Sequence, residues 1–227
     1  MKYDVIKAVI FDQRETIKTI DLIERHYSLE YSLNYVLLGL RRAGKTMMLY
    51  SVVKDLISNK VDWDQIIYIN FEDERLAEFK MSDFNDIVLV KNELTDKKGY
   101  YFFDEIQNID GWEKFARRLA DQKEFVYITG SNAKMLSKEV SETLGGRFIP
   151  EYISTFSFSE YLAAREIQHD DIALETTKLR GIVAGACDQY LHDGGFPESL
   201  LYHARREYIS TVLQKIILGV MVDMDSI

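Results

Sequence analysis

Residues 39 to 46 read Gly39-Leu40-Arg41-Arg42-Ala43-Gly44-Lys45-Thr46, which matches the phosphate-loop pattern G-x-x-x-x-G-K-[ST] at every defined position. Glycines allow the tight turn in which successive backbone N–H groups converge on phosphate oxygens. The helix expected to start here adds the partial positive charge of its N-terminus. In such a loop Lys45 reaches the β- and γ-phosphates, and the Thr46 hydroxyl ligates Mg²⁺. The stretch therefore predicts that all eight residues bind a nucleoside triphosphate.

The flanking sequence has the strand and the helix that this mechanism needs. Residues 35–38 form an apolar run before the loop. After it, apolar residues recur on one stripe of a helix: Met48, Leu49, Val52, Val53, Leu56 and Ile57. Further strand-like runs occupy residues 66–71, 100–103 and 125–129, with a weaker one at 148–153. Nearly continuous apolar strands that alternate with helices indicate an α/β fold with a doubly wound parallel sheet.

The chain is predicted to have three parts. Residues 1–30 read as a helical segment, 31–155 as the P-loop core, and 156–227 as a helical subdomain, because the strand signal ends near residue 158. A turn at residues 194–197 interrupts the helical pattern of this last part. The chain stops after an apolar helical pattern without an obvious cap, which a truncated chain would explain.

Two acids follow the apolar run at residues 100–103. In a P-loop sheet, Asp104 at this place lies beside Mg²⁺, and Glu105 points toward the γ-phosphate, where it polarises the attacking water. Such a pair after a strand is also typical of ordinary helix-start charges. The phosphate loop some sixty residues earlier favours the catalytic interpretation.

Three further residues are candidates for contact with the γ-phosphate or the lytic water. Ser131 and Asn132 follow the strand at 125–129, although a turn and helix cap explains them as well. Arg147 is a candidate to stabilise the transferring phosphoryl group, in its own subunit or in a neighbour's site. An ordinary surface arginine is the alternative.

Composition narrows the function classes. The net charge of −9 over 227 residues gives no support for a surface devoted to nucleic acid, which needs clustered Lys and Arg. The single cysteine, Cys187, rules out an internal disulfide and is expected to be buried filler. Neither a signal peptide nor an apolar run of roughly 20 residues is present, so we expect a cytoplasmic protein that does not insert in a membrane.

Two further stretches resemble nucleotide-binding motifs but are interpreted otherwise. Residues 59–62 match the N-K-x-D pattern that reads guanine, but they follow the phosphate-loop helix directly, which is the wrong place. A loop at the end of a helix is the better interpretation. Residues 72–75 are interpreted as a solvated capping run rather than as nucleotide ligands.

The motifs together resemble the prokaryotic AAA-14 ATPases, in which an AAA-like core precedes a domain of unknown function, DUF4143. The matching stretches are GLRRAGKT at 39–46, FFDEIQ at 102–107, ITGSN at 128–132, LGGRF at 144–148, SFSEYL at 157–162 and GGFPE at 194–198. The resemblance spans roughly residues 5 to 215. It implies sheet order 5-1-4-3-2, Asp104 and Glu105 as the Walker B pair, and a chain from which most of the C-terminal domain is missing.

The leading functional hypothesis is a Mg²⁺-dependent ATPase in which hydrolysis drives a conformational switch. A second is a binding module that uses ATP as a structural ligand or slow timer in a DNA-associated or toxin-related assembly. A third is a small-molecule kinase, although the region after Phe148 offers only scattered arginines for a phosphate lid. An unidentified protein partner is expected, and homo-oligomerisation stays open.

Overall fold

The computed structural model describes residues 2–130, 142–167 and 176–224. The chain divides into two compact units, each made of separate stretches. The first unit, called the sheet unit here, comprises Met1–Leu22, Tyr27–Leu38 and Lys45–Tyr152. The second, called the helical unit, comprises Ile23–His26, Gly39–Gly44 and Ile153–Ile227.

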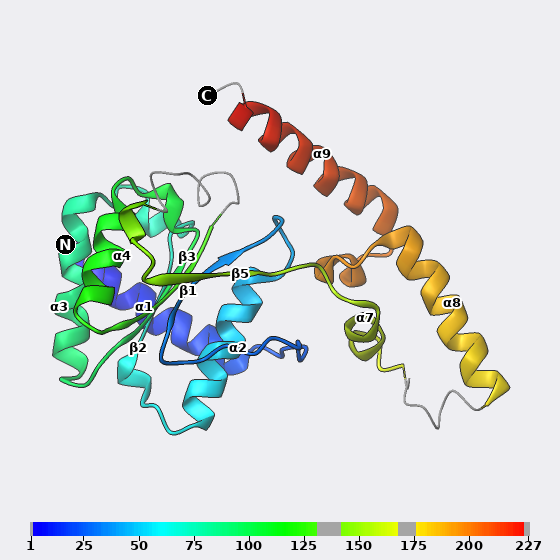
Figure 1. The fold of residues 1–227 in the computed structure, drawn as a ribbon, viewed down its shortest axis with the longest axis horizontal. Helices are drawn as coiled ribbons and strands as arrows, with labels where there is room; N and C mark the ends of the chain where they lie inside the picture. The colour runs from blue at the N-terminus through cyan, green and yellow to red at the C-terminus, as the bar shows by residue number, and fades with distance from the viewer. Residues whose placement is uncertain (1, 131–141, 168–175, 225–227) are drawn as a thin grey trace. The chain divides into compact units, whose positions relative to one another are not determined.

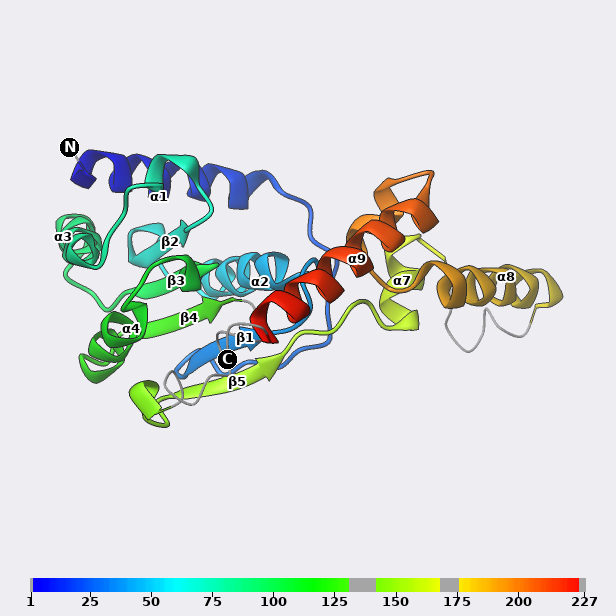
Figure 2. The same ribbon diagram turned by 90° about the horizontal axis from the view of Figure 1, so that it is seen from above.

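The sheet unit is built on five parallel strands (Figure 1). They are β1 (Asn34–Leu38), β2 (Ile66–Asn70), β3 (Tyr100–Asp104), β4 (Phe125–Thr129) and β5 (Phe148–Tyr152). Their order is β2-β3-β4-β1-β5, as Figure 2 shows from one edge to the other. Read from the opposite edge this is 5-1-4-3-2, so the predicted strand order is confirmed.

Three of the described helices cover one face of this sheet. They are α1 (Lys2–Thr19), α3 (Phe84–Leu94) and α4 (Trp112–Asp121), and α1 lies beside the β2 edge in Figure 2. Their apolar side chains join those of alternate strand residues, such as Val36, Tyr101 and Ile128, in one buried cluster. In the described part of this unit, short 3-10 helices lie in the connections: η1 (Trp63–Gln65), η2 (Glu74–Leu76), η3 (Met81–Asp83) and η4 (Ile106–Asn108).

The helix α2 (Lys45–Ser58) packs on the opposite face, where the strands present aromatic rings. Stacked or tilted ring contacts run from strand to strand through Tyr35, Tyr127, Phe102 and Tyr68 and end on Tyr50 of α2. Side chains on a strand alternate between faces, so residues two positions beyond these rings face α2 as well. The carboxyl ends of β3 and β4 are therefore aimed at the first turn of this helix.

The helical unit contains α7 (Phe158–Ala164), α8 (Thr177–Asp193), η6 (Pro197–Leu201) and α9 (Arg205–Met224). Its small core joins Phe156, Tyr161, Leu162 and Ala186. A capping box starts α7, because Ser157 and Glu160 each accept a hydrogen bond from the other's backbone N–H. The expected helical character of the chain after residue 158 is confirmed for the described part.

The division into units differs from the three parts expected from sequence. The first helix ends at Thr19, so residues 20–30 are not helical, and its buried Ile6, Val9 and Ile10 belong to the core of the sheet unit. Residues 39–44 group with the helical unit instead of the sheet. Both assignments depend on contacts between residues far apart in the chain, which the spacing of apolar residues along the sequence cannot predict.

Among the described helices, none has the combination of length and apolarity that crossing a membrane needs.

Candidate functional site

Asp104 is placed by strand register. It lies two residues after Phe102, so its side chain faces α2, and the pairing of Phe103 with Ile128 puts it beside Thr129 on β4. Its carboxylate accepts hydrogen bonds from Thr129 Oγ1, from Thr46 Oγ1 at 2.7 Å and from the Tyr68 hydroxyl at 3.1 Å. The structure thus brings together the last residue of the phosphate-loop motif and the acid that ends the third strand.

The electrostatic environment of Asp104 opposes its charge. The side chain is only 1% exposed, and this burial is the main cause that raises the pKa of its carboxyl above the ordinary value, with the charge of Glu105 acting in the same direction. The three hydroxyl hydrogen bonds lower the pKa in part. A carboxylate in such a place is stabilised by a cation, and oxygen donors are the ligands that Mg²⁺ prefers. The pair of Thr46 and Asp104 therefore fits a Mg²⁺ ion.

Glu105 has an unusual backbone. Its φ of 52° and ψ of 39° lie in the left-handed region, which a non-glycine residue occupies at a cost on the order of 1 kcal/mol. Its N–H donates to Thr129 Oγ1 at 3.1 Å, and its carboxylate accepts a bond from Gln107 Nε2 at 2.6 Å. The side chain makes no capping bond to η4, which follows it. Glu105 is therefore not a side-chain cap of η4, and the alternative of a helix-start charge is left to the variants tested below.

The loop Gly39–Gly44 has the backbone shape that the motif requires. A Cβ added at Gly39, where φ is 150°, would lie 2.1 Å from the carbonyl oxygen of Ile153, so only glycine fits there. The third residue after it, Arg42, has φ 64°, and Ala43 N donates to Leu40 O at 3.1 Å. This tight turn leads directly into α2 at Lys45, a helix with no acidic side chain in its first turn. A helix start without its own acid suits a phosphate group.

The other predicted residues have different outcomes. Arg147 lies just before β5, at the amino ends of the parallel strands, and its guanidinium pairs with Asp121. Thr46 and Asp104 lie at the opposite, carboxyl-end edge, so the structure does not bring Arg147 to them within the sheet unit. A role in a neighbour's site stays a prediction. Ser131 and Asn132 fall outside the described residues.

Four residues at or near this site carried no assigned role in the sequence interpretation. Tyr68 and Thr129 both bond Asp104, Gln107 bonds Glu105, and Arg25 donates to the carbonyl of Ala43 in the loop. Thr129 is a polar end to an otherwise apolar strand, which was a usable signal. Tyr68 and Arg25 are far from their partners in sequence, and no local sequence signal indicates their roles.

The stretches 59–62 and 72–75, which were not interpreted as nucleotide ligands, have structural roles. Asp62, the last residue of the N-K-x-D match, pairs with Lys97 at 2.6 Å in the loop that follows α2. Asp73 accepts a bond from the N–H of Arg75 at the start of η2 and pairs with its guanidinium. Both outcomes agree with the interpretations of a helix-ending loop and a capping run.

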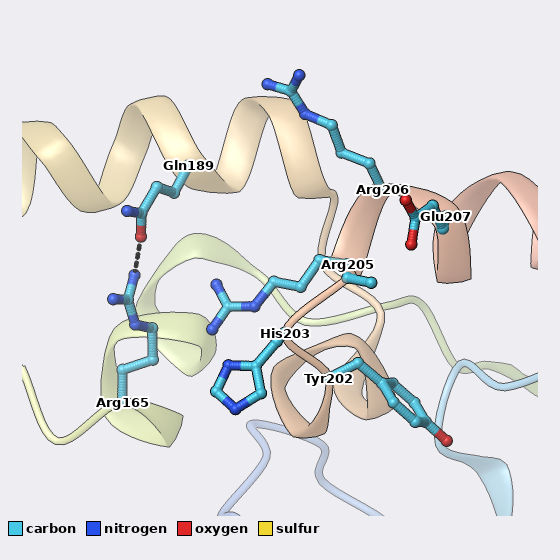
Figure 3. A pocket seen from close by; sticks show the side chains of 8 residues that line it. Arg165, Gln189, Tyr202, His203, Arg205, Arg206 and Glu207 are labelled. Atoms are coloured by element: carbon cyan, nitrogen blue, oxygen red, sulfur yellow. Dashed lines mark hydrogen bonds between the residues drawn. The ribbon is translucent and has the colours of Figure 1, made fainter.

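A separate hollow of about 500 Å³ lies within the helical unit (Figure 3). It is lined by Arg165, Gln189, Tyr202, His203, Ala204, Arg205, Arg206 and Glu207. Arg165 bonds Gln189 across it at 2.6 Å, whereas Arg206 and Tyr202 point away from the other side chains in Figure 3. No residue of the phosphate-loop motif lines this hollow, so it is distinct from the candidate nucleotide site.

Comparison with known families decides the wider grouping. A family model described as an AAA domain, AAA_14, matches residues 32–162. The chain belongs to this family. The AAA_14 match covers β1, the phosphate loop and the Asp104–Glu105 pair, and it confirms the resemblance inferred from the motifs. An AAA domain is a nucleotide-binding, ATPase-like module.

Two curated relatives match over longer stretches. The uncharacterised protein MJ1544 of Methanocaldococcus jannaschii is 33% identical over 230 residues, which covers 98% of this chain and 50% of the relative. An uncharacterised protein of Haemophilus influenzae is 31% identical over 169 residues, or 73% of this chain and 40% of that protein. This AAA_14 chain thus spans about half the length of the curated relatives that it matches, or less.

Solved structures also resemble the chain. The Hsp104–ADP complex of S. cerevisiae matches with a TM-score of 0.49 and 19% identity, covering 84% of this chain and 29% of that one. The ORC1 protein of Aeropyrum pernix, solved in complex with DNA, matches with a TM-score of 0.39 and 18% identity, covering 91% and 64%.

Proposed function

We propose that this AAA domain binds ATP with Mg²⁺ and hydrolyses it to ADP and phosphate. The observation that carries the proposal is the 2.7 Å bond between Thr46 Oγ1 and Asp104 Oδ2, which joins the phosphate-loop motif to the acid pair at the end of β3. A match to the motif alone is a pattern in sequence. The structure adds that the Thr46 hydroxyl of the motif contacts the buried carboxylate of Asp104. These two oxygen donors are the ones that a Mg²⁺-bound triphosphate needs.

In this proposal each residue has one task. The backbone of Gly39–Gly44 holds phosphate oxygens, Lys45 neutralises their charge, and Thr46 and Asp104 hold the metal ion. Glu105 takes the proton of the attacking water or polarises it. The carboxylate of Glu105 is oriented by Gln107, which donates to it.

We further propose that hydrolysis acts as a conformational switch. Support comes from the assignment of residues 39–44 to the helical unit, because the residues that would bind phosphate then fold with α7, α8 and α9. The alternative is a module that binds ATP and turns it over slowly or not at all. The presence of Glu105 in its strained, oriented conformation favours hydrolysis over this alternative.

The proposal is tested through the metal. Thr46→Ala removes the hydroxyl that meets Asp104, so the Mg²⁺ concentration needed for half-maximal ATP turnover should rise at least about tenfold, a typical loss when one group around a bound metal is removed. Thr46→Ser keeps the hydroxyl and is the matched control. The measurement is phosphate release in a Mg²⁺ titration of parent and variants. An unchanged midpoint in Thr46→Ala, or a parent that turns over equally well in EDTA, would contradict the metal assignment.

ATP should be preferred over GTP. The single match to a guanine-reading motif lies in the loop after α2, and its Asp62 is engaged by Lys97, so it does not offer a free carboxylate to guanine. We expect GTP to compete at least about tenfold more weakly, a difference of about 1.4 kcal/mol. Competition of both nucleotides for a fluorescent ATP analogue measures this ratio. Equal or tighter binding of GTP would show that base recognition has been assigned wrongly.

A further inference from the structure

The phosphate loop is bonded to two parts of the helical unit that the proposed chemistry does not use. One is Arg25, which belongs to the non-helical stretch after α1. The other is the pair of η6 and α9, whose Glu198 and Tyr208 bond one residue of the loop. Each contact involves a different residue of the loop, and all of them lie within one unit.

Arg25 lies directly against the end of the loop. Its Nη1 donates to the carbonyl of Ala43 at 3.0 Å, and a Cβ built on Gly44 would lie 3.2 Å from the same nitrogen. Its Nη2 donates to the carbonyl of Ser154 at 2.8 Å. The guanidinium therefore ties the loop to the segment that follows β5.

The remaining bonds of Arg25 anchor it to α7. Its Nε pairs with Glu160 at 3.2 Å, and both side chains are only 6% exposed. Glu160 is itself held, because it accepts a bond from the N–H of Ser157 at 2.7 Å in the capping box of α7. A guanidinium has five N–H donors in a rigid plane, and in this place they connect a loop carbonyl, a chain segment and a helix start at once.

A second contact holds Arg42. Its Nη1 bonds Glu198 at 2.8 Å and the hydroxyl of Tyr208 at 3.3 Å, and Tyr208 in turn donates to Glu198 at 2.9 Å. Arg42 occupies the left-handed region, with φ 64°. Its side-chain bonds therefore constrain a residue whose backbone conformation is otherwise disfavoured.

Both contacts are made to groups of the loop other than its backbone N–H groups, namely the carbonyl of Ala43 and the side chain of Arg42. Carbonyl oxygens repel phosphate, so a bond that holds the Ala43 carbonyl keeps it turned toward Arg25. A loop already in its binding conformation loses less entropy when phosphate binds.

We propose that Arg25 and Glu198 are positioning residues of the phosphate loop, so that nucleotide affinity depends on the fold of the helical unit. Arg25 fixes the carbonyl of Ala43, and Glu198 clamps the side chain of Arg42. Neither residue belongs to the motif. The nucleotide effect rests on the proposed ATP site, but the ordering of the loop does not, and the experiment separates the two.

The first readout needs no nucleotide. Hydrogen–deuterium exchange of the peptide that contains residues 39–45 is measured in the full chain, for Arg25→Lys and Glu198→Gln. Exchange should become faster in both variants, because each loses bonds that hold the loop. Arg165→Lys is the control for the first, since Arg165 bonds Gln189 (Figure 3) and Tyr161 within the same unit. Glu207→Gln is the control for the second.

The second readout is steady-state turnover. The KM for MgATP should rise about tenfold in Arg25→Lys and Glu198→Gln, within the usual range for coupling between sites, whereas kcat stays within about twofold. A merely destabilised protein would lose active fraction and thus apparent kcat, without this shift in KM. Both controls should keep the KM of the parent.

Unchanged loop exchange in Glu198→Gln, an exposed position where a folding defect is not expected, would overturn the proposal. Faster exchange with unchanged KM would also overturn it, since the loop would be held for a reason other than nucleotide. A parent that fails to bind MgATP refutes the ATP site itself, and the exchange data then show whether the two contacts order the loop regardless.

Discussion

Lys45→Ala should abolish tight binding of MgATP. Lys45 opens α2 at the end of the phosphate loop and is only 6% exposed. Arg42 also belongs to the motif, but its guanidinium bonds Glu198 and Tyr208, so we do not expect it to replace Lys45 at the phosphates. The variant loses charge-assisted bonds worth about 3 kcal/mol, so affinity should fall at least about 100-fold. Isothermal titration with MgATP measures the change.

The control for this variant is Lys54→Ala. Lys54 lies on the same helix, and its ammonium donates to the carbonyl of Ile20, away from the motif. Its removal tests whether loss of any lysine from α2 weakens binding through stability alone. If Lys45→Ala binds MgATP within about threefold of the parent, the assignment of the loop as a phosphate cradle is wrong.

Glu105→Gln should stop turnover and leave ATP affinity nearly unchanged. The amide keeps the size of the side chain and can still accept the hydrogen bond from Gln107, but it removes the base and its charge. General-base assistance is typically worth about 10²–10⁴-fold in rate. We therefore expect kcat to fall by this factor and the ATP-bound state to accumulate. Single-turnover hydrolysis together with equilibrium binding separates the two effects.

Two comparisons sharpen this prediction. Glu113→Gln removes a carboxylate from the first turn of α4, and it represents the alternative in which Glu105 is only a helix-start charge. If the two variants behave alike, that alternative holds. Asp104→Asn should instead weaken Mg²⁺ and nucleotide binding together with catalysis, because Asp104 bonds Thr46 at the proposed metal position. A parent that binds but does not hydrolyse ATP would favour the binding-module hypothesis.

Local sequence signals predicted much of the sheet unit. The apolar runs at residues 35–38, 66–71, 100–103 and 125–129 each became a strand within one residue of the expected bounds. The helix after the phosphate loop also has the expected buried stripe, including Met48, Val52 and Leu56. These signals are readable because each is contained in a few neighbouring residues. The strand order came from the family resemblance, since an apolar run does not state which strand lies beside it.

The sequence by itself determined the chemistry of the candidate site, because the spacing in the motif 39–46 and the adjacency of Asp104 and Glu105 are properties of the chain. Only the tertiary structure decided the surroundings of that site. Register across β3 and β4 placed Thr129 on Asp104, and pairing with β2 brought the Tyr68 hydroxyl to the same carboxylate.

Arg25 shows the limit most clearly. Its partner Glu160 lies 135 residues away in sequence, and no local pattern marks either residue as part of a phosphate-binding loop. Their pairing depends on the chain after β5 folding back to the end of that loop, where a buried guanidinium needs several acceptors at once. The residues that would contact phosphate can therefore be identified from the sequence motif. The residues that hold the loop in its conformation can be identified only from the tertiary structure, because they contact it from distant parts of the chain.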